Sequence, residues 1–133
     1  MSKVIHFEFG ADKPERAIKF YEDVFQWKIT KYPGTVDYWP IKAGTEDEIG
    51  INGAIAPRQK YWNISNSVAV HSVDEYLERI EMHGGEALTE KAVVPKMGYM
   101  AYFKDTEGNT LSILKPIRTP NSLNPEFKNL SWS

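Results

Sequence analysis

The sequence predicts an α+β fold in which two βαβββ modules form a curved, eight-stranded mixed sheet around a cleft, with the helices outside. An alternating strand, a capping box and an amphipathic helix occur twice, about sixty residues apart. Each helix is followed by short alternating stretches that turn residues separate. Because a module of this size cannot bury both faces of its own sheet, we expect the two modules to pack side by side.

The first module is expected over residues 1–60, and its first strand over residues 4–9. Successive side chains of a strand point to opposite faces, and the residues here alternate between an apolar and a polar face. The apolar face carries Ile5, Phe7 and Phe9, and the polar face carries His6 and Glu8. The polar face must therefore meet water, a ligand or a polar partner, since an unpaired buried carboxylate is costly.

A helix is predicted after this strand, with Asp12 as the N-cap, Pro14 in the first turn and Glu15 completing a capping box. Apolar residues then recur at helical spacing and form one stripe, namely Ala17, Phe20, Tyr21, Val24 and Phe25. Three further strands are expected at residues 27–32, 37–42 and 50–56, and residues 57–60 link the two modules.

The second module, residues 61–116, follows the same order. Its strands are expected at 65–70, 87–94, 98–103 and 110–114. Ser72 and Glu75 form the capping box of its helix, which ends at His83 before two glycines. Residues 117–133 lose all periodicity and are predicted to be an extended C-terminal tail. A dimeric ferredoxin-like barrel is a weaker alternative, because it does not explain the repeat.

Composition excludes several classes of protein. The 133 residues carry a net charge of −2 with scattered lysines and arginines, which argues against nucleic-acid binding. The absence of cysteine excludes disulfides, thiolate nucleophiles and thiolate metal sites. No apolar run is long enough to cross a membrane, and the strand pattern begins too early to leave room for a signal peptide, so we expect a soluble cytoplasmic protein.

Four motifs suggest a family. They are His6 six places before Asp12, the segment 17–27, the triplet His83-Gly84-Gly85 and the turn 102–109 with its Asp-Thr-Glu-Gly-Asn sequence. Over residues 3–116 the chain resembles the vicinal oxygen chelate superfamily, the group of glyoxalases, bleomycin-resistance proteins and extradiol dioxygenases. The resemblance implies paired βαβββ modules around a cleft and a homodimer. A fold alone does not imply a function.

Enzymes of that superfamily typically hold a divalent metal between four strands, with His, Gln or Glu as ligands. Carried over to this chain, the ligand positions fall on His6, on Asn52 or Gly53, on Asn66 and on Ser112. Only His6 is a ligand of the family type. Amides and a hydroxyl cannot balance the charge of the metal, so we expect no metal cofactor, although a divalent metal stays possible.

His6 and Glu8 share a strand face and could both point into the cleft. One interpretation is a general-base pair or a partial ligand set completed by water. The alternative is that they form local hydrogen bonds, or that Glu8 reaches a lysine or tyrosine on a neighbouring strand.

Three functions compete. The favoured one is a metal-independent binder of a small organic molecule, with tentative catalytic residues His6 and Glu8 and with Asn52, Asn66, Tyr102 and Ser112 as ligand-binding residues. The alternative is a glyoxalase-like lyase or related enzyme that uses His6 and Glu8 with an atypical metal or none. The third is a module of a larger assembly that the C-terminal tail contacts. The sequence leaves open whether the chain is an enzyme.

Overall fold

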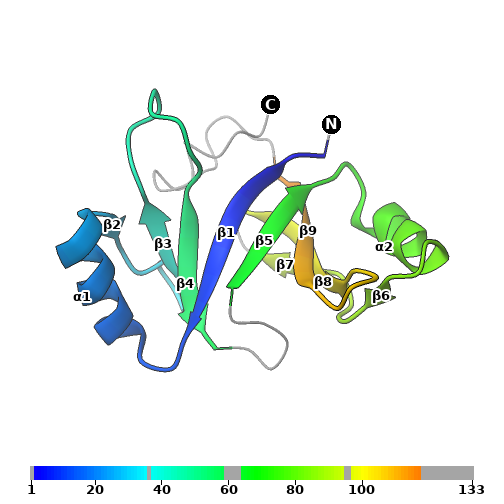
Figure 1. The fold of residues 1–133 in the computed structure, drawn as a ribbon, viewed down its shortest axis with the longest axis horizontal. Helices are drawn as coiled ribbons and strands as arrows, with labels where there is room; N and C mark the ends of the chain where they lie inside the picture. The colour runs from blue at the N-terminus through cyan, green and yellow to red at the C-terminus, as the bar shows by residue number, and fades with distance from the viewer. Residues whose placement is uncertain (1, 36, 59–63, 95–96, 118–133) are drawn as a thin grey trace.

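The computed structural model describes residues 2–35, 37–58, 64–94 and 97–117. Within these ranges the chain forms two helices and nine strands of a single sheet (Figure 1). The elements of the first module are β1 (Val4–Ala11), α1 (Pro14–Phe25), β2 (Lys28–Ile29), β3 (Trp39–Lys42) and β4 (Gly53–Pro57). Those of the second are β5 (Ile64–Ala69), α2 (Val73–Met82), β6 (Glu86–Ala87), β7 (Ala92–Val94), β8 (Gly98–Lys104) and β9 (Thr110–Pro116).

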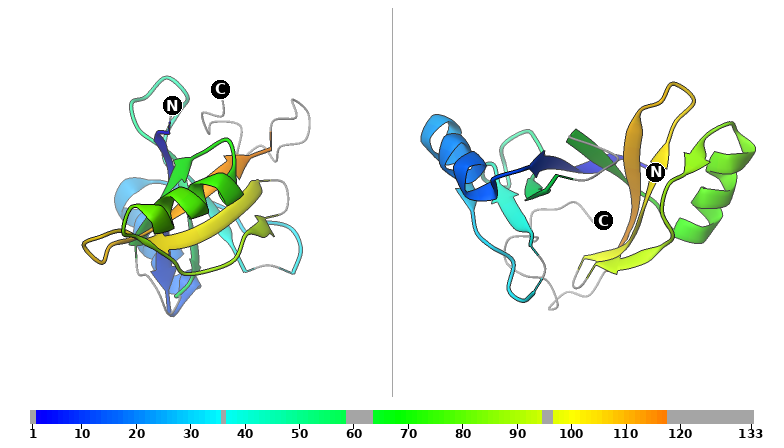
Figure 2. Two further views of the ribbon diagram at one scale, coloured as in Figure 1. Left: turned by 90° about the vertical axis from the view of Figure 1, so that its right-hand side faces the viewer. Right: turned by 90° about the horizontal axis from the view of Figure 1, so that it is seen from below.

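The sheet runs in the order β2-β3-β4-β1-β5-β9-β8-β6, and β7 pairs with β8 beside this path. The antiparallel pair β1 and β5 joins the modules, and each of these strands has a parallel partner from its own module, β4 or β9. Figure 2 shows the sheet curling, with α1 and α2 outside at opposite ends. The predicted fold class is confirmed. The ninth strand arises because the stretch predicted at 87–94 divides into β6 and β7.

Each helix covers the outer face of its own module. The core under α1 is centred on Ile29, Ile41 and Ile55, and the core under α2 on Val73, Ala101 and Ile113. A third cluster lies on the inner, concave face of the sheet and joins the modules. Its buried members are Ile5, Tyr32, Tyr38, Ala54, Ala56, Met97, Met100 and Leu114.

Ile5 departs from the predicted alternation. Phe7 and Phe9 pack in the core under α1 as expected, but Ile5 belongs to the concave cluster. The cause is a register shift between Val4 and His6 where β1 pairs with β5. A bulge of this kind adds a residue to one strand and breaks its strict alternation, which a pattern of period two cannot anticipate.

The two helices begin differently. Ser72 caps α2 as predicted, since its hydroxyl accepts a hydrogen bond of 3.1 Å from the amide of Glu75. The prediction that Asp12 caps α1 is wrong. The N-cap is Lys13, which makes no side-chain cap, and the Asp12 carboxylate instead pairs with Arg58 at 3.0 Å.

The apolar stripe of α1 is only partly covered. Tyr21 packs on the core, whereas Phe20, Val24 and Phe25 remain about half exposed. Neither helix in the described ranges is long and apolar enough to cross a membrane. The predicted C-terminal tail lies outside the described residues, except for Ile117.

Candidate functional site

His6 and Glu8 share one face of β1, as the sequence predicted, and this face is on the concave side of the sheet. Both are buried, with exposed fractions of 0% and 3%. Their register partners on β5 are Ser67 and Ser65. The burial of two titratable groups at the junction of the modules makes this the candidate site, because such groups need partners to remain in an apolar interior.

Tyr38 joins the two side chains. Its hydroxyl lies 2.8 Å from His6 Nε2 and donates a hydrogen bond of 3.0 Å to Glu8 Oε2. The hydroxyl of Tyr102, on β8, donates a bond of 2.7 Å to Glu8 Oε1. His6 Nε2 itself is 3.7 Å from Glu8 Oε2, which is too long for a hydrogen bond. The alternative in which Glu8 reaches a tyrosine is right about the residue type but not about a neighbouring strand. Tyr38 precedes β3 and Tyr102 lies on β8, and neither strand pairs with β1.

These contacts decide the charges of the site. Burial alone would raise the pKa of Glu8, but the His6 imidazole and the hydroxyls of Tyr102 and Tyr38 outweigh burial and hold that pKa below its ordinary value. Burial raises the pKa of Tyr38 well above its ordinary value, and the neighbouring Glu8 carboxylate raises it further. The network therefore holds an ionised carboxylate and a protonated Tyr38 phenol that donates to it.

The second module adds hydroxyl groups. The side chains of Ser67, on β5, and Ser112, on β9, lie opposite each other and share a hydrogen bond of 2.7 Å. Two buried side-chain atoms in the described ranges have no hydrogen-bond partner, His6 Nδ1 and Ser65 Oγ. Unsatisfied buried polar atoms are uncommon in folded proteins and call for an explanation such as a ligand or an ordered water.

Asn66 lies on the opposite face from the one predicted. It pairs in register with Phe7, it is exposed, and the buried side chains of β5 are those of Ser65 and Ser67. A repeat of sixty residues aligns His6 with Asn66. The concave positions of β5 are odd-numbered, so an odd offset is needed. The buried residue of β5 that pairs with His6 is Ser67, and the sequence pattern did not identify it.

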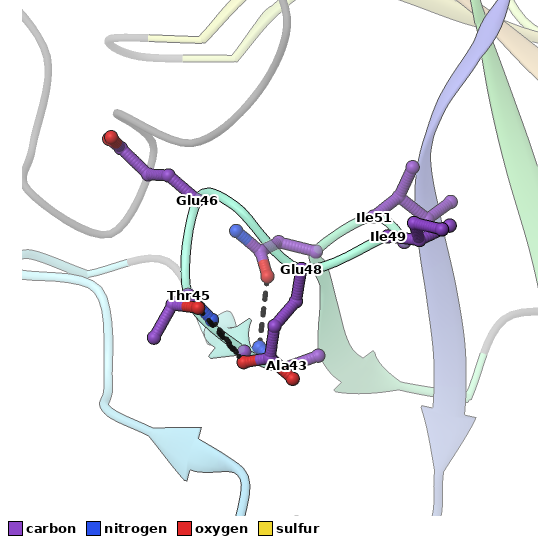
Figure 3. A pocket seen from close by; sticks show the side chains of 9 residues that line it. Ala43, Thr45, Glu46, Glu48, Ile49 and Ile51 are labelled. Atoms are coloured by element: carbon purple, nitrogen blue, oxygen red, sulfur yellow. Dashed lines mark hydrogen bonds between the residues drawn. The ribbon is translucent and has the colours of Figure 1, made fainter.

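Asn52 is buried but serves its own loop. Its side-chain carbonyl accepts a hydrogen bond of 2.9 Å from the amide of Ala43 and so closes the loop 43–52. A cavity of about 80 Å³ lies in this loop, and Figure 3 shows Glu48 folded back onto Thr45 there. A second cavity of about 390 Å³ lies beside the start of α1, against Arg16, Phe20 and Arg58. None of the network residues lines either cavity.

The side chains around His6 do not form a conventional metal site. Across the register of β1, β5 and β9, the neighbours of His6 are the hydroxyls of Ser67 and Ser112, which bond to each other. In the described ranges, no group of three or more His, Cys, Asp or Glu residues is placed to hold an ion. Divalent metals of catalytic sites are usually held by three imidazole or carboxylate ligands, so this donor set does not fit one.

Comparison with known proteins places these features in context. The family model described as Glyoxalase/Bleomycin resistance protein/Dioxygenase superfamily matches residues 3–113. A protein named a putative glyoxylase, from Mycobacterium bovis and Mycobacterium tuberculosis, is 30% identical over 115 residues, which cover 82% of this chain. The match spans only 42% of the length of those relatives.

Solved structures share the fold at low identity. A hypothetical protein from Bacillus halodurans has a TM-score of 0.68 at 13% identity and covers 90% of this chain and 98% of its own. Methylmalonyl-CoA epimerase from Streptomyces coelicolor has a TM-score of 0.67 at 11% identity, covering 90% and 99%. The Mycobacterium tuberculosis epimerase has a TM-score of 0.64 at 11% identity, covering 86% and 88%. At these identities the likeness shows the fold alone.

Proposed function

The chain belongs to the glyoxalase/bleomycin resistance protein/dioxygenase superfamily, and we propose that it binds a small organic molecule on the concave face of its sheet. His6 and Ser65 supply the buried polar atoms without a hydrogen-bond partner. Tyr102 bonds to Glu8 on the same face, and the Ser67–Ser112 pair lies next to His6 across the strands. Asn52 and Asn66 leave this set, because one closes a loop and the other faces away.

The observation that carries the proposal is the pair of buried atoms without partners, His6 Nδ1 and Ser65 Oγ. Leaving a buried polar atom unpaired costs about 1–3 kcal/mol. A ligand that bonds to either atom recovers this free energy, so the unliganded site favours binding. The neighbouring tyrosines add aromatic surface, which suits an organic ligand with a few polar groups.

We propose further that binding needs no metal. Support comes from Ser112, whose hydroxyl stands at a position where the family resemblance places a metal ligand and bonds to the hydroxyl of Ser67. The test is elemental analysis of the natively purified protein by mass spectrometry. The proposal requires that no transition metal be present in stoichiometric amount. A metal at one equivalent that is lost in His6→Ala would overturn it.

Ligand binding is tested by a thermal-shift screen against small neutral organic molecules, followed by calorimetry on the hits. Hits should bind the wild type with one-to-one stoichiometry, and His6→Ala should weaken them tenfold or more, as loss of one buried hydrogen bond predicts. The matched control is His71→Ala, which removes an exposed histidine that pairs with Glu75 at the start of α2. Equal weakening by both substitutions would place the ligand elsewhere.

A second candidate function is that of an enzyme, and the Glu8–Tyr38–His6 chain favours it. In the serine-protease triad, a buried carboxylate supports the cation that forms when an imidazole takes a proton. Glu8 could support His6 in the same way through Tyr38, with His6 Nδ1 as the general base. Turnover of a hemithioacetal, formed from methylglyoxal and a thiol, tests the glyoxalase-like reaction, and His6→Ala should abolish it.

We also propose a homodimer. The exposed side chains of Phe20, Val24 and Phe25 on α1 support it, since monomers rarely leave contiguous apolar surface uncovered. Light scattering after size exclusion should give twice the chain mass of 15.2 kDa. Phe25→Glu should shift the protein toward the monomer, whereas Lys28→Glu, at the exposed start of β2, should not. A monomeric wild type at micromolar concentration would refute the proposal.

A further inference from the structure

The hydroxyl of Tyr38 carries one proton but touches two acceptor-capable groups. It lies 2.8 Å from His6 Nε2 and 3.0 Å from Glu8 Oε2. A phenol can donate only one hydrogen bond, while its oxygen can accept others. If the Tyr38 hydroxyl donates to one of these two groups, the other group must donate a hydrogen bond to the Tyr38 oxygen. The direction of the Tyr38 hydrogen bond therefore determines whether His6 Nε2 carries a hydrogen.

The Tyr38 hydroxyl donates its one hydrogen bond to Glu8. An ionised carboxylate is an acceptor only, and both of its oxygens are contacted by tyrosine hydroxyls, Oε2 by Tyr38 and Oε1 by Tyr102. The two hydroxyl donors stabilise the ionised form of this buried carboxylate. With its proton committed to Glu8, the Tyr38 oxygen can only accept from the imidazole. His6 Nε2 must then carry a hydrogen.

The remaining ring nitrogen decides between the neutral and the cationic imidazole. Nδ1 is buried and has no partner. In the imidazolium this atom would carry a buried, unpaired N–H, and orphaned N–H donors are rarer in proteins than unsatisfied acceptors. In the neutral form with hydrogen on Nε2, Nδ1 presents only a lone pair. The geometry therefore favours the neutral Nε2–H tautomer in the free protein.

We propose that Tyr38 and Glu8 hold His6 as the Nε2–H tautomer, so that Nδ1 accepts a hydrogen bond and the site selects an uncharged ligand that presents an O–H or N–H group. The statement about the ligand rests on the proposed function of the concave face. The statement about the tautomer does not, because it concerns the protein alone. Tyr38 is in this scheme a positioning residue.

Two features of the site disfavour an anionic ligand. The Glu8 carboxylate carries a negative charge in a buried position, 3.7 Å from His6 Nε2, and like charges at short range repel strongly away from water. No described lysine or arginine forms an ion pair with Glu8 or borders the hydroxyls of Ser67 and Ser112 at hydrogen-bond distance. A carboxylate also cannot donate to an acceptor such as Nδ1.

The first experiment measures the tautomer by long-range ¹H–¹⁵N correlation on protein labelled at its histidine rings, at neutral pH and without ligand. The expected pattern assigns the proton of His6 to Nε2 and none to Nδ1. Tyr38→Phe removes the hydroxyl and should abolish this single-tautomer pattern. The control is Tyr32→Phe, which removes another buried phenol from the same cluster and should leave the pattern intact.

A proton on Nδ1 of His6 in the wild type would overturn the proposal, whether from the other tautomer or from the imidazolium. An unchanged pattern in Tyr38→Phe would overturn the role of Tyr38. Loss of dispersed spectra in Tyr38→Phe would indicate unfolding. The decision then falls on Tyr102→Phe, which removes the hydrogen bond to the other oxygen of Glu8. The Tyr38 hydroxyl still donates to Glu8 in this variant, so the proton of His6 should stay on Nε2, and a proton on Nδ1 would overturn the role of Tyr38.

The second experiment compares three probes of similar size, namely phenol, methyl phenyl ether and benzoate. Phenol should shift the Nδ1 resonance of His6 and bind about tenfold more tightly than the ether, as one hydrogen bond predicts. Benzoate should leave the resonance unmoved. Benzoate binding as tightly as phenol would overturn the ligand selectivity. Failure of all three probes, with the expected tautomer present, would refute ligand binding here while leaving the tautomer established.

Discussion

The two modules repeat one order of elements but bring different chemistry to the concave face. The first contributes an imidazole, a carboxylate and a phenol, from His6, Glu8 and Tyr38. The second contributes the hydroxyls of Ser65, Ser67 and Ser112, together with Tyr102, which reaches across to Glu8. The repeated backbone therefore does not produce a repeated site. One module holds the charge and the acceptors, and the other holds groups that can donate to a ligand.

This difference shows that the backbone repeat and the site obey separate constraints. Packing fixes the alternation of buried and more exposed residues, which β1 follows from His6 to Phe9 and β5 from Ile64 to Ser67. The identity of the inward polar residues is free to differ, because a hydroxyl pair satisfies itself whereas a buried carboxylate needs partners from several segments. Glu8 accordingly accepts hydrogen bonds from Tyr38 of the first module and Tyr102 of the second. The hydrogen bond between Ser67 and Ser112 lies within the second module.

The largest expected difference between the modules is the loss of stability when a glycine of each is replaced by alanine. A β-carbon at Gly98 would collide with the backbone oxygen of Lys115, and Gly98 has φ of +140°, a conformation that side chains rarely adopt. A β-carbon at Gly53 would meet the backbone oxygen and ring of Phe7, but its φ lies outside that positive range. Gly98→Ala should therefore cost about 3 kcal/mol or more in unfolding free energy, and more than Gly53→Ala.

Urea denaturation at neutral pH measures both substitutions. Gly108→Ala is the control, since it has φ of +84° but open space around the added carbon, and it isolates the backbone strain. It should cost about 1 kcal/mol. Equal costs for Gly98→Ala and Gly53→Ala would mean that the collision alone governs these positions and that the positive φ of Gly98 adds nothing.

Most of the fold could be predicted from the sequence, but less of the site. Alternation on β1 and the apolar spacing of the helices identify the modules, because burial imposes a period on many residues at once. The bulge at Ile5 and the inward face of β5 depend on single-residue register, which one sequence does not determine. Tyr38 lies in a stretch predicted as a strand, but the sequence does not determine which face it occupies. Its contact with His6, thirty-two positions away, therefore emerges only from the folded chain.

The hydroxyl pair gives the next prediction. Ser67→Ala leaves the hydroxyl of Ser112 buried without its partner, and should cost about 1–2 kcal/mol of unfolding free energy. Ser112→Ala should cost a similar amount. The double variant should cost less than the sum of the two, because it removes both polar groups together. Additive effects in urea denaturation would mean that the two hydroxyls stabilise the protein independently and do not depend on the hydrogen bond between them.

The Glu8 carboxylate of the first module should make the unfolding free energy depend on pH. The pKa of folded Glu8 lies below its ordinary value of 4.5, so the unfolded chain binds its proton more tightly than the native state. Glu8 therefore stabilises the fold above pH 4.5 and loses this contribution as the pH falls through its folded pKa. Unfolding free energy should decrease less steeply with acid in Glu8→Gln than in the wild type. Glu78→Gln, an exposed position on α2, is the control and should follow the wild type.

The smallest expected effect concerns the starts of the two helices. Ser72→Ala removes the side-chain cap of α2 and should cost about 1 kcal/mol. The corresponding position of α1 is Lys13, whose side chain makes no capping hydrogen bond. Lys13→Ser should thus stabilise the protein by roughly 0.5 kcal/mol, because a serine hydroxyl can accept a bond from the first turn. If Lys13→Ser destabilised the protein instead, the interactions around Asp12 and Arg58 would already satisfy this helix start, and the missing cap would not be a weakness of the first module.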